Sequence, residues 1–151
     1  MKMYLRFLLM VLTATLIMYG LMYSTIFSLD HLFFSEMRTY MAIYMGAVMA
    51  IVMLLFMQHM YKNKKINIAI YALSALLFIG AFWLARSQET IDDVDYMQAM
   101  IPHHSIAILT SERAEITDPR VKQLSEEIIE AQRKEIEEMK KLIDDLEEEE
   151  D

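Results

Sequence analysis

Three long uncharged stretches occupy the first part of the chain. No Asp, Glu, Lys or Arg occurs from Phe7 to Leu29, from Thr39 to Tyr61 or from Ile66 to Ala85. A helix needs about 20 apolar residues to cross the hydrocarbon core of a bilayer, and each stretch is at least that long. The pattern predicts three transmembrane helices. The first stretch is too long for the apolar region of a typical signal peptide, so we expect it to span the membrane too.

The positive charges near these stretches predict their orientation. They are Lys2, Arg6, Lys62, Lys64 and Lys65, which precede the first stretch or lie between the second and third. The loop between the first and second stretches holds one Arg against two acidic residues. Loops rich in Lys and Arg remain in the cytoplasm. We therefore expect a cytoplasmic N-terminus, and three crossings then place the residues after Arg86 outside the cytoplasm.

The remainder of the chain mixes apolar and charged residues at helical spacing. A first helix is predicted from about Ile91 to Ile116, with acidic residues in its opening turn, where the helix dipole favours negative charge. A second helix is predicted to begin at Asp118 and Pro119, because Asp is a good N-cap and proline fits the first helical position. Its one-sided apolar stripe is Val121, Leu124, Ile128, Ile129, Ile136, Met139, Ile143 and Leu146.

These elements predict an all-α protein with two domains. Residues 1–86 form a three-helix membrane anchor, and residues 87–151 form a helical hairpin with an acidic tail. One hairpin of this length cannot bury both apolar faces, and domains this small usually need a metal, a disulfide or a partner chain. The chain contains no cysteine, which leaves a metal or a partner. We expect two hairpins from separate copies to complete a four-helix bundle.

Charge divides the chain in the same way. Residues 1–85 carry a net charge of +4 and residues 86–151 carry −12, which together give the chain's −8. A region this acidic repels nucleic acid and anionic lipid surfaces, so neither is an expected partner. It suits a solvated domain that attracts cations. The partners we expect are the lipid bilayer, a metal ion and a second copy of the chain.

Methionine and histidine side chains are placed where a soft metal site is feasible. Two sets of three residues have the helical spacing i, i+3, i+7, so each set shares one helix face. The first set is Met97, Met100 and His104, and the second is Gln132, Glu135 and Met139. Thioether sulfur suits cuprous copper, and imidazole suits copper as well. Outside the cytoplasm, methionine also avoids the disulfide formation that removes thiols.

A histidine doublet follows a proline in the first of these helices. His103 and His104 point about 100° apart on a regular helix, so both cannot easily reach one ion. Pro102 lacks the N–H that would bond to residue 98, and we expect it to kink the helix. The kink would swing His103 towards the same site, or leave it to a second site or a partner chain.

Residues 93 to 146 resemble the family called domain of unknown function 305. The motifs that carry the resemblance are Met-x-x-His-His, here Met100 to His104, and Gln-x-x-Glu-Ile-x-x-Met, here Gln132 to Met139. The three predicted spans also resemble the membrane-attached branch of that family. The resemblance implies a ferritin-like helical bundle, histidine and methionine ligands, and an association with copper tolerance in bacteria.

Together these observations predict a protein of the bacterial inner membrane that captures or buffers cuprous copper or silver in the periplasm. The predicted ligands are Met97, Met100, His103, His104 and Met139. The residues expected to orient an imidazole are Gln132 and Glu135, a role that carboxylates often fill beside metal-bound histidine. We expect a binding protein without enzymatic activity.

Two other functions remain open on sequence alone. The first is a scaffold or assembly subunit whose hairpin only oligomerises. The second is a ferritin-like metal oxidase, but such sites use Glu-x-x-His pairs. The residues three positions before His103 and His104 are Met100 and Ile101, so no such pair exists at the doublet.

A row of methionines lies in the second apolar stretch. It consists of Met37, Met41, Met45, Met49, Met53 and Met57. Each step of four residues drifts about 40° around the helix, so the row winds instead of following one straight face. A path for a soft metal should line one interior face of a helix bundle. We therefore expect these flexible apolar side chains to serve packing.

Overall fold

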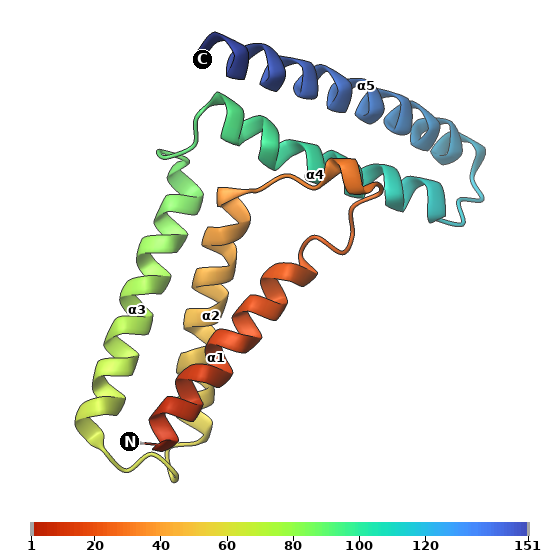
Figure 1. Ribbon diagram of the computed structural model, residues 1–151. Helices are drawn as coiled ribbons and strands as arrows, with labels where there is room; N and C mark the ends of the chain where they lie inside the picture. Colours follow the sequence, from red (N-terminus) through yellow and green to blue (C-terminus); the bar gives the residue numbers. More distant parts are fainter. Residues whose placement is uncertain (1, 151) are drawn as a thin grey trace. The chain divides into compact units, whose positions relative to one another are not determined.

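All regular structure in the described part of the chain is helical. The computed structural model describes residues 2–150, with the side chain of Glu150 left out, and contains no strand in that range (Figure 1). Its elements are α1 (Lys2–Leu21), the 3-10 turn η1 (Leu29–His31), α2 (Glu36–Phe56), α3 (Lys64–Ser87), α4 (Asp93–Arg113) and α5 (Pro119–Glu150). The predicted all-α class is confirmed.

The chain divides into two compact units, and one of them is assembled from separate pieces of sequence. The first unit contains α1, α2 and α3, and the second contains α4, α5 and the segment Tyr23–Glu36. We call this segment the strap. The sequence alone predicts that the strap belongs to the membrane anchor, because the strap begins inside the first apolar stretch and ends just before the second.

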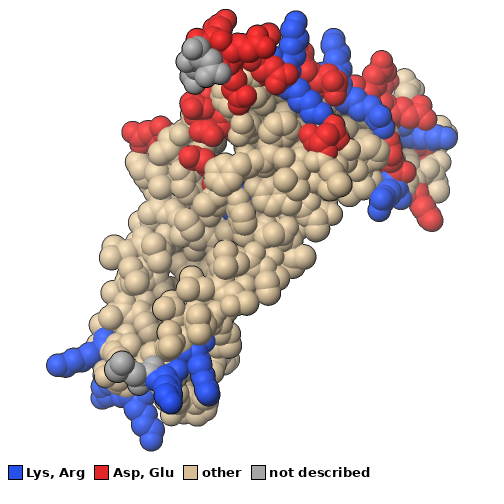
Figure 2. Space-filling view, viewed as in Figure 1, with Lys and Arg blue, Asp and Glu red and all other residues tan. Residues whose placement is uncertain are grey.

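The first unit has the properties of a membrane anchor. Helices α1, α2 and α3 are each long and apolar enough to cross a membrane, judged by length and composition. In Figure 2, Lys and Arg gather at the end of this unit where α1 begins and where the α2–α3 loop lies. The predicted first stretch is longer than the helix that forms: α1 ends at Leu21, and the strap follows almost directly.

Small residues bring α1 and α2 close together. Ala42, Gly46 and Ala50 recur every fourth position in α2 and are buried, a pattern that lets membrane helices approach closely. A Cβ atom added at Gly46 would lie 2.5 Å from Oγ1 of Thr15 in α1. Glycine is therefore the residue that fits this crossing.

The methionine row begins in α2 beside this buried stripe and ends at Met57, directly after the helix. All six of its methionines are half-buried. Met53 and Met57 pack against a core cluster that consists of Phe7, Val11, Ala50, Leu54 and Tyr61. At this end of the helix the methionines fill space between apolar side chains, which supports the packing role.

Helices α4 and α5 begin at capping residues. Asp92 accepts a hydrogen bond of 2.8 Å from the backbone N–H of Asp95 at the start of α4. Asp118 accepts one of 2.9 Å from the N–H of Arg120, directly after the first residue of α5, Pro119. The acidic tail continues α5 as far as Glu150.

Helices α4 and α5 lie side by side in opposite directions and share a core (Figure 1). This core consists of Met97, Ile101, Ile108, Ile136 and Ile143. Three of its isoleucines, at 101, 108 and 136, are less than 2% exposed. Phe33 of the strap packs against the same core, so the strap belongs to the hydrophobic packing of this unit.

Candidate metal centre

A groove of about 540 Å³ runs between α4 and α5. Its lining residues are Asp93, Tyr96, Met97, Met100, His104, Glu135, Glu138, Met139, Leu142 and Leu146. Five of these were singled out from the sequence as ligands or as partners of a ligand. The antiparallel packing of the two helices therefore brings the first predicted set and two residues of the second, Glu135 and Met139, into one space. We call it the Met–His groove.

His104 is held through both ring nitrogens. Nδ1 lies 2.9 Å from the backbone carbonyl oxygen of Met100. A carbonyl only accepts, so Nδ1 carries the proton of this bond. Nε2 lies 2.8 Å from Oε2 of Glu135 on the facing helix. A bond from one ring nitrogen to a carbonyl is typical of metal-binding histidine, because it fixes the ring and leaves the other nitrogen for the ion.

Glu135 and a metal ion compete for the same nitrogen. When Nε2 of His104 carries a proton, it donates that proton to the Glu135 carboxylate. When Nε2 carries no proton, its lone pair can bind an ion. We predicted from the sequence that Glu135 would orient an imidazole. In the structure the Met100 carbonyl holds the ring at Nδ1, and Glu135 faces the nitrogen that a metal would use.

The donors that line the groove fit a soft monovalent ion. Met97 is buried, and Met100 and Met139 are half-buried, so three thioethers and one imidazole line a partly enclosed space. Thioethers prefer cuprous copper to hard divalent ions. Among residues 2–150, no three His, Asp or Glu side chains are close enough together to hold a metal ion.

Two predicted residues do not reach the groove. His103 is exposed and Gln132 is half-buried, and neither lines the groove. The ring centroids of His103 and His104 are 6.2 Å apart with an angle of 65° between the planes. Helix α4 continues through the buried Pro102, so the two neighbours keep the divergent directions of a regular helix.

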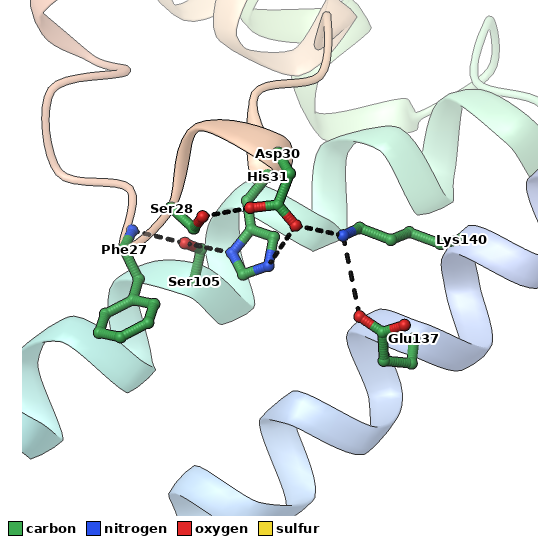
Figure 3. Close-up of polar contacts among 7 residues, drawn as sticks. All are labelled: Phe27, Ser28, Asp30, His31, Ser105, Glu137 and Lys140. Carbon is green, nitrogen blue, oxygen red and sulfur yellow. Dashed lines mark hydrogen bonds and ion pairs between the residues drawn. The ribbon is translucent and has the colours of Figure 1, made fainter.

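A second polar cluster joins the strap to both helices (Figure 3). His31 is 7% exposed, and its Nδ1 lies 2.9 Å from Oγ of Ser105 in α4. The same Oγ accepts a bond of 2.6 Å from the backbone N–H of Phe27. Asp30 accepts a bond of 2.6 Å from Nζ of Lys140 in α5. We call the four side chains of Asp30, His31, Ser105 and Lys140 the latch.

The electrostatics of the latch follow from its contacts. The hydrogen bond from Lys140 holds the pKa of Asp30 far below its usual range, and a further bond from Ser28 acts in the same direction. Burial lowers the pKa of His31, although the neighbouring Asp30 carboxylate opposes that shift. Nε2 of His31 lies 3.6 Å from Oδ2 of Asp30. The buried imidazole is therefore neutral near neutral pH, while Asp30 is charged.

Asp30, His31 and Ser105 have the side-chain types of a hydrolase triad, but the burial of Ser105 argues against that role. Ser105 is completely buried, and its oxygen already accepts the Phe27 N–H. A nucleophile must reach its substrate, and this hydroxyl is closed off. A cavity of about 330 Å³ beside the latch is lined by Phe27, Ser28, Asp30, His31, Ile108, Arg133, Ile136 and Glu137, and Ser105 is not among them.

The chain is similar in sequence to a protein family and to a known viral protein. Residues 86–151 match the family described as Domain of unknown function (DUF305). The chain is also 34% identical over 108 residues to Uncharacterized protein L153 of Acanthamoeba polyphaga mimivirus, and the match covers 70% of this chain and 69% of that protein. The chain belongs to the DUF305 family. No solved structure matches it.

The DUF305 region contains the whole Met–His groove but only half of the latch. Ser105 and Lys140 lie within residues 86–151, whereas Asp30 and His31 come from the strap. Helical periodicity gives no sign that His31 and Asp30 contact residues that lie 74 and 110 positions further along the chain. The available sign is the local run from Ser28 to His31, which brings three polar residues to the end of a long apolar stretch.

Proposed function

We propose that this DUF305 protein captures or buffers cuprous copper, or silver, with its α4–α5 hairpin. The observation that carries the proposal is the Met–His groove, where Met97, Met100 and His104 of α4 line the same space as Met139 of α5. Soft thioether donors are of little use to zinc, magnesium or calcium. Their concentration around one tethered imidazole favours a soft monovalent ion as the cargo.

Each residue of the groove has a distinct part in capture. His104 supplies Nε2, with its ring held by the Met100 carbonyl. The thioethers of Met97, Met100 and Met139 supply sulfur. Oε2 of Glu135 lies 2.8 Å from Nε2, so an ion that binds Nε2 displaces this carboxylate. The carboxylates of Asp93 and Glu138 also line the groove, where they attract cations towards the sulfur ligands.

We propose further that the hairpin lies outside the cytoplasm and is attached by α1, α2 and α3 to the inner membrane of a bacterium. The basic residues at the start of α1, in the α2–α3 loop and at the start of α3 support this orientation. In this compartment, sulfur ligands without a thiol have an advantage, because they do not form disulfides. The ion is cargo, and the side chains that would serve a ferritin-like oxidase, the Glu-x-x-His pairs, are absent from the doublet.

A competition titration tests the proposal. The full-length protein in detergent is titrated with cuprous copper against a cuprous chelator, and the variants His104→Ala, Met100→Ala and Met139→Ala are compared with the wild type. We expect each variant to bind at least about tenfold more weakly, which corresponds to about 1.4 kcal/mol. His104→Ala should have the largest effect, because it removes the imidazole as well as the tether.

The matched control is His103→Ala. It removes a histidine one position away that is exposed and does not line the groove, so its affinity should stay close to that of the wild type. Equal affinities for the wild type, Met100→Ala and His104→Ala would contradict the proposal. Loss of binding in His103→Ala alone would move the site away from the groove.

A further inference from the structure

The strap residues of the latch bind the hairpin at two positions that are adjacent in sequence to residues of the Met–His groove. Ser105, bonded to His31, follows His104 directly in α4. Lys140, bonded to Asp30, follows Met139 directly in α5. Figure 3 shows that His31 and Asp30, neighbours in the strap, reach these two helices from one short turn. One segment of the strap therefore fixes α4 and α5 beside a ligand on each.

The contacts between the strap and α4 are buried, whereas the contact between the strap and α5 is partly exposed. His31 and Ser105 are 7% and 0% exposed, and the bond from the Phe27 N–H adds a second link to the same hydroxyl. The Lys140 side chain is 23% exposed and that of Asp30 is 59% exposed. Arg133 of α5 also lies over the Phe27 ring, 5.4 Å from its centroid. The strap is thus bound to both helices through independent contacts.

We propose that the strap sets the spacing of the Met–His groove, so that Asp30 and His31 act as positioning residues for the metal site, and that metal occupancy and strap docking reinforce each other. This inference rests on the proposed function. Soft ligands on two separate helices bind one ion only when the helices keep their distance and register. The strap fixes both through Ser105 and Lys140, without contributing a ligand.

Reciprocity follows from thermodynamic linkage. If the docked strap raises the affinity of the groove by some factor, the bound ion must favour docking of the strap by the same factor. The strap is continuous with α1 at one end and with α2 at the other. Binding of an ion in the groove would therefore reduce the mobility of the chain where α1 ends and where α2 begins. The bound metal would in this way affect the ends of two helices of the membrane anchor.

The first test measures affinity. Lys140→Gln in the full-length protein removes the bond to Asp30, and we expect cuprous copper to bind about fivefold more weakly in chelator competition, the scale that a partly exposed ion pair supports. Lys140→Arg keeps the charge and should restore most of the affinity. Lys141→Gln changes an exposed neighbour and should have no effect.

The second test measures the strap itself by hydrogen exchange, with and without silver ion. We expect silver to slow exchange at the amide of Phe27, which donates to Ser105, and at the amide of His31, which donates to the Ser28 carbonyl. In His31→Phe this slowing should be lost even when silver still binds. Exchange in the middle of α3 serves as the internal reference.

The outcomes separate this inference from the proposed function. If the wild type binds neither copper nor silver, both are wrong. If the wild type binds, but Lys140→Gln binds equally well and silver leaves the strap amides unchanged, the positioning role is wrong and the metal site stands. If Lys140→Arg is as weak as Lys140→Gln, the ion pair with Asp30 is not the cause of the effect.

Discussion

His103 and His104 are adjacent in α4, yet their surroundings differ in every respect that matters for binding an ion. His104 is tethered at Nδ1 by Met100 and faces the groove, whereas His103 is exposed. The sequence identified the shared face of Met97, Met100 and His104 because that face follows from helical spacing alone. It could not decide the position of His103, because that depended on whether Pro102 redirects the helix.

His31 makes the stability of the second unit depend on pH. Burial lowers its pKa from the ordinary value of 6.5, so the folded unit binds a proton less readily than the unfolded chain. The stabilisation is present above pH 6.5 and is lost as the pH falls towards the folded value. Asp30, Lys140, Glu137 and Arg133 face the imidazole and modulate the shift.

We therefore expect the strap to dock less tightly at about pH 5 than at about pH 7.5. Amide exchange of Phe27 in the full-length protein, corrected for the intrinsic effect of pH, measures this change. His31→Asn should flatten the dependence. The pKa of Asp30 is lowered as well, but its stabilisation is lost only in stronger acid, below its ordinary value of 3.8. A wild-type profile as flat as that of His31→Asn would contradict the role of His31.

The helix boundaries show which signals in the sequence are sufficient to predict where a helix begins or ends. The start of α5 at Pro119 was predicted because the cap, Asp118, is local. The end of α1 was not, since the apolar run continues to Leu29 while the helix ends at Leu21. An apolar run shows that a helix is long enough to span a membrane, but it does not show that Phe27, Asp30 and His31 leave the helix and contact α4 and α5.

Packing of α1 against α2 yields a prediction with a built-in control. Gly46→Leu would force side-chain atoms into the space taken by Thr15, where even a Cβ atom is 2.5 Å from Oγ1. Nothing lies within 4 Å of the corresponding Cβ at Gly80 in α3. We expect Gly46→Leu to lower the thermal midpoint by several degrees in detergent, measured by circular dichroism, and Gly80→Leu to leave it nearly unchanged. Equal midpoints would show that the crossing tolerates bulk.

The strap and the α4–α5 pair belong to one compact unit, so the proposed topology requires both on the same side of the membrane. The chain has no native cysteine, which makes single labelling sites simple to introduce. Under the proposed orientation, Leu29→Cys and Glu115→Cys should react with an impermeant maleimide in intact cells. Asn63→Cys, between α2 and α3, should react only after lysis.

Leu29 is 84% exposed, and Glu115 is exposed as well, so a lack of reaction at either site would not be explained by burial. Reaction at residue 63 in intact cells, with residues 29 and 115 protected, would reverse the orientation. Labelling of only one of the residues 29 and 115 would mean that the strap and the helices are not on one side. The sequence predicted three spans from length alone, but it could not assign the strap, because that assignment rests on long-range contacts.

Recombinant fragments are usually cut at family boundaries, and here that choice would divide a folding unit. A fragment that starts at residue 86, where the family match begins, lacks Phe27 and His31 and so leaves the buried hydroxyl of Ser105 without them. It also leaves Lys140 without Asp30. Joining residues 23–36 to the fragment through a flexible linker would restore these contacts, since the entropy of loop closure rises only slowly with length. The smallest fragment that keeps the native contacts of Ser105 and Lys140 without the three apolar helices therefore combines two separate segments of the chain.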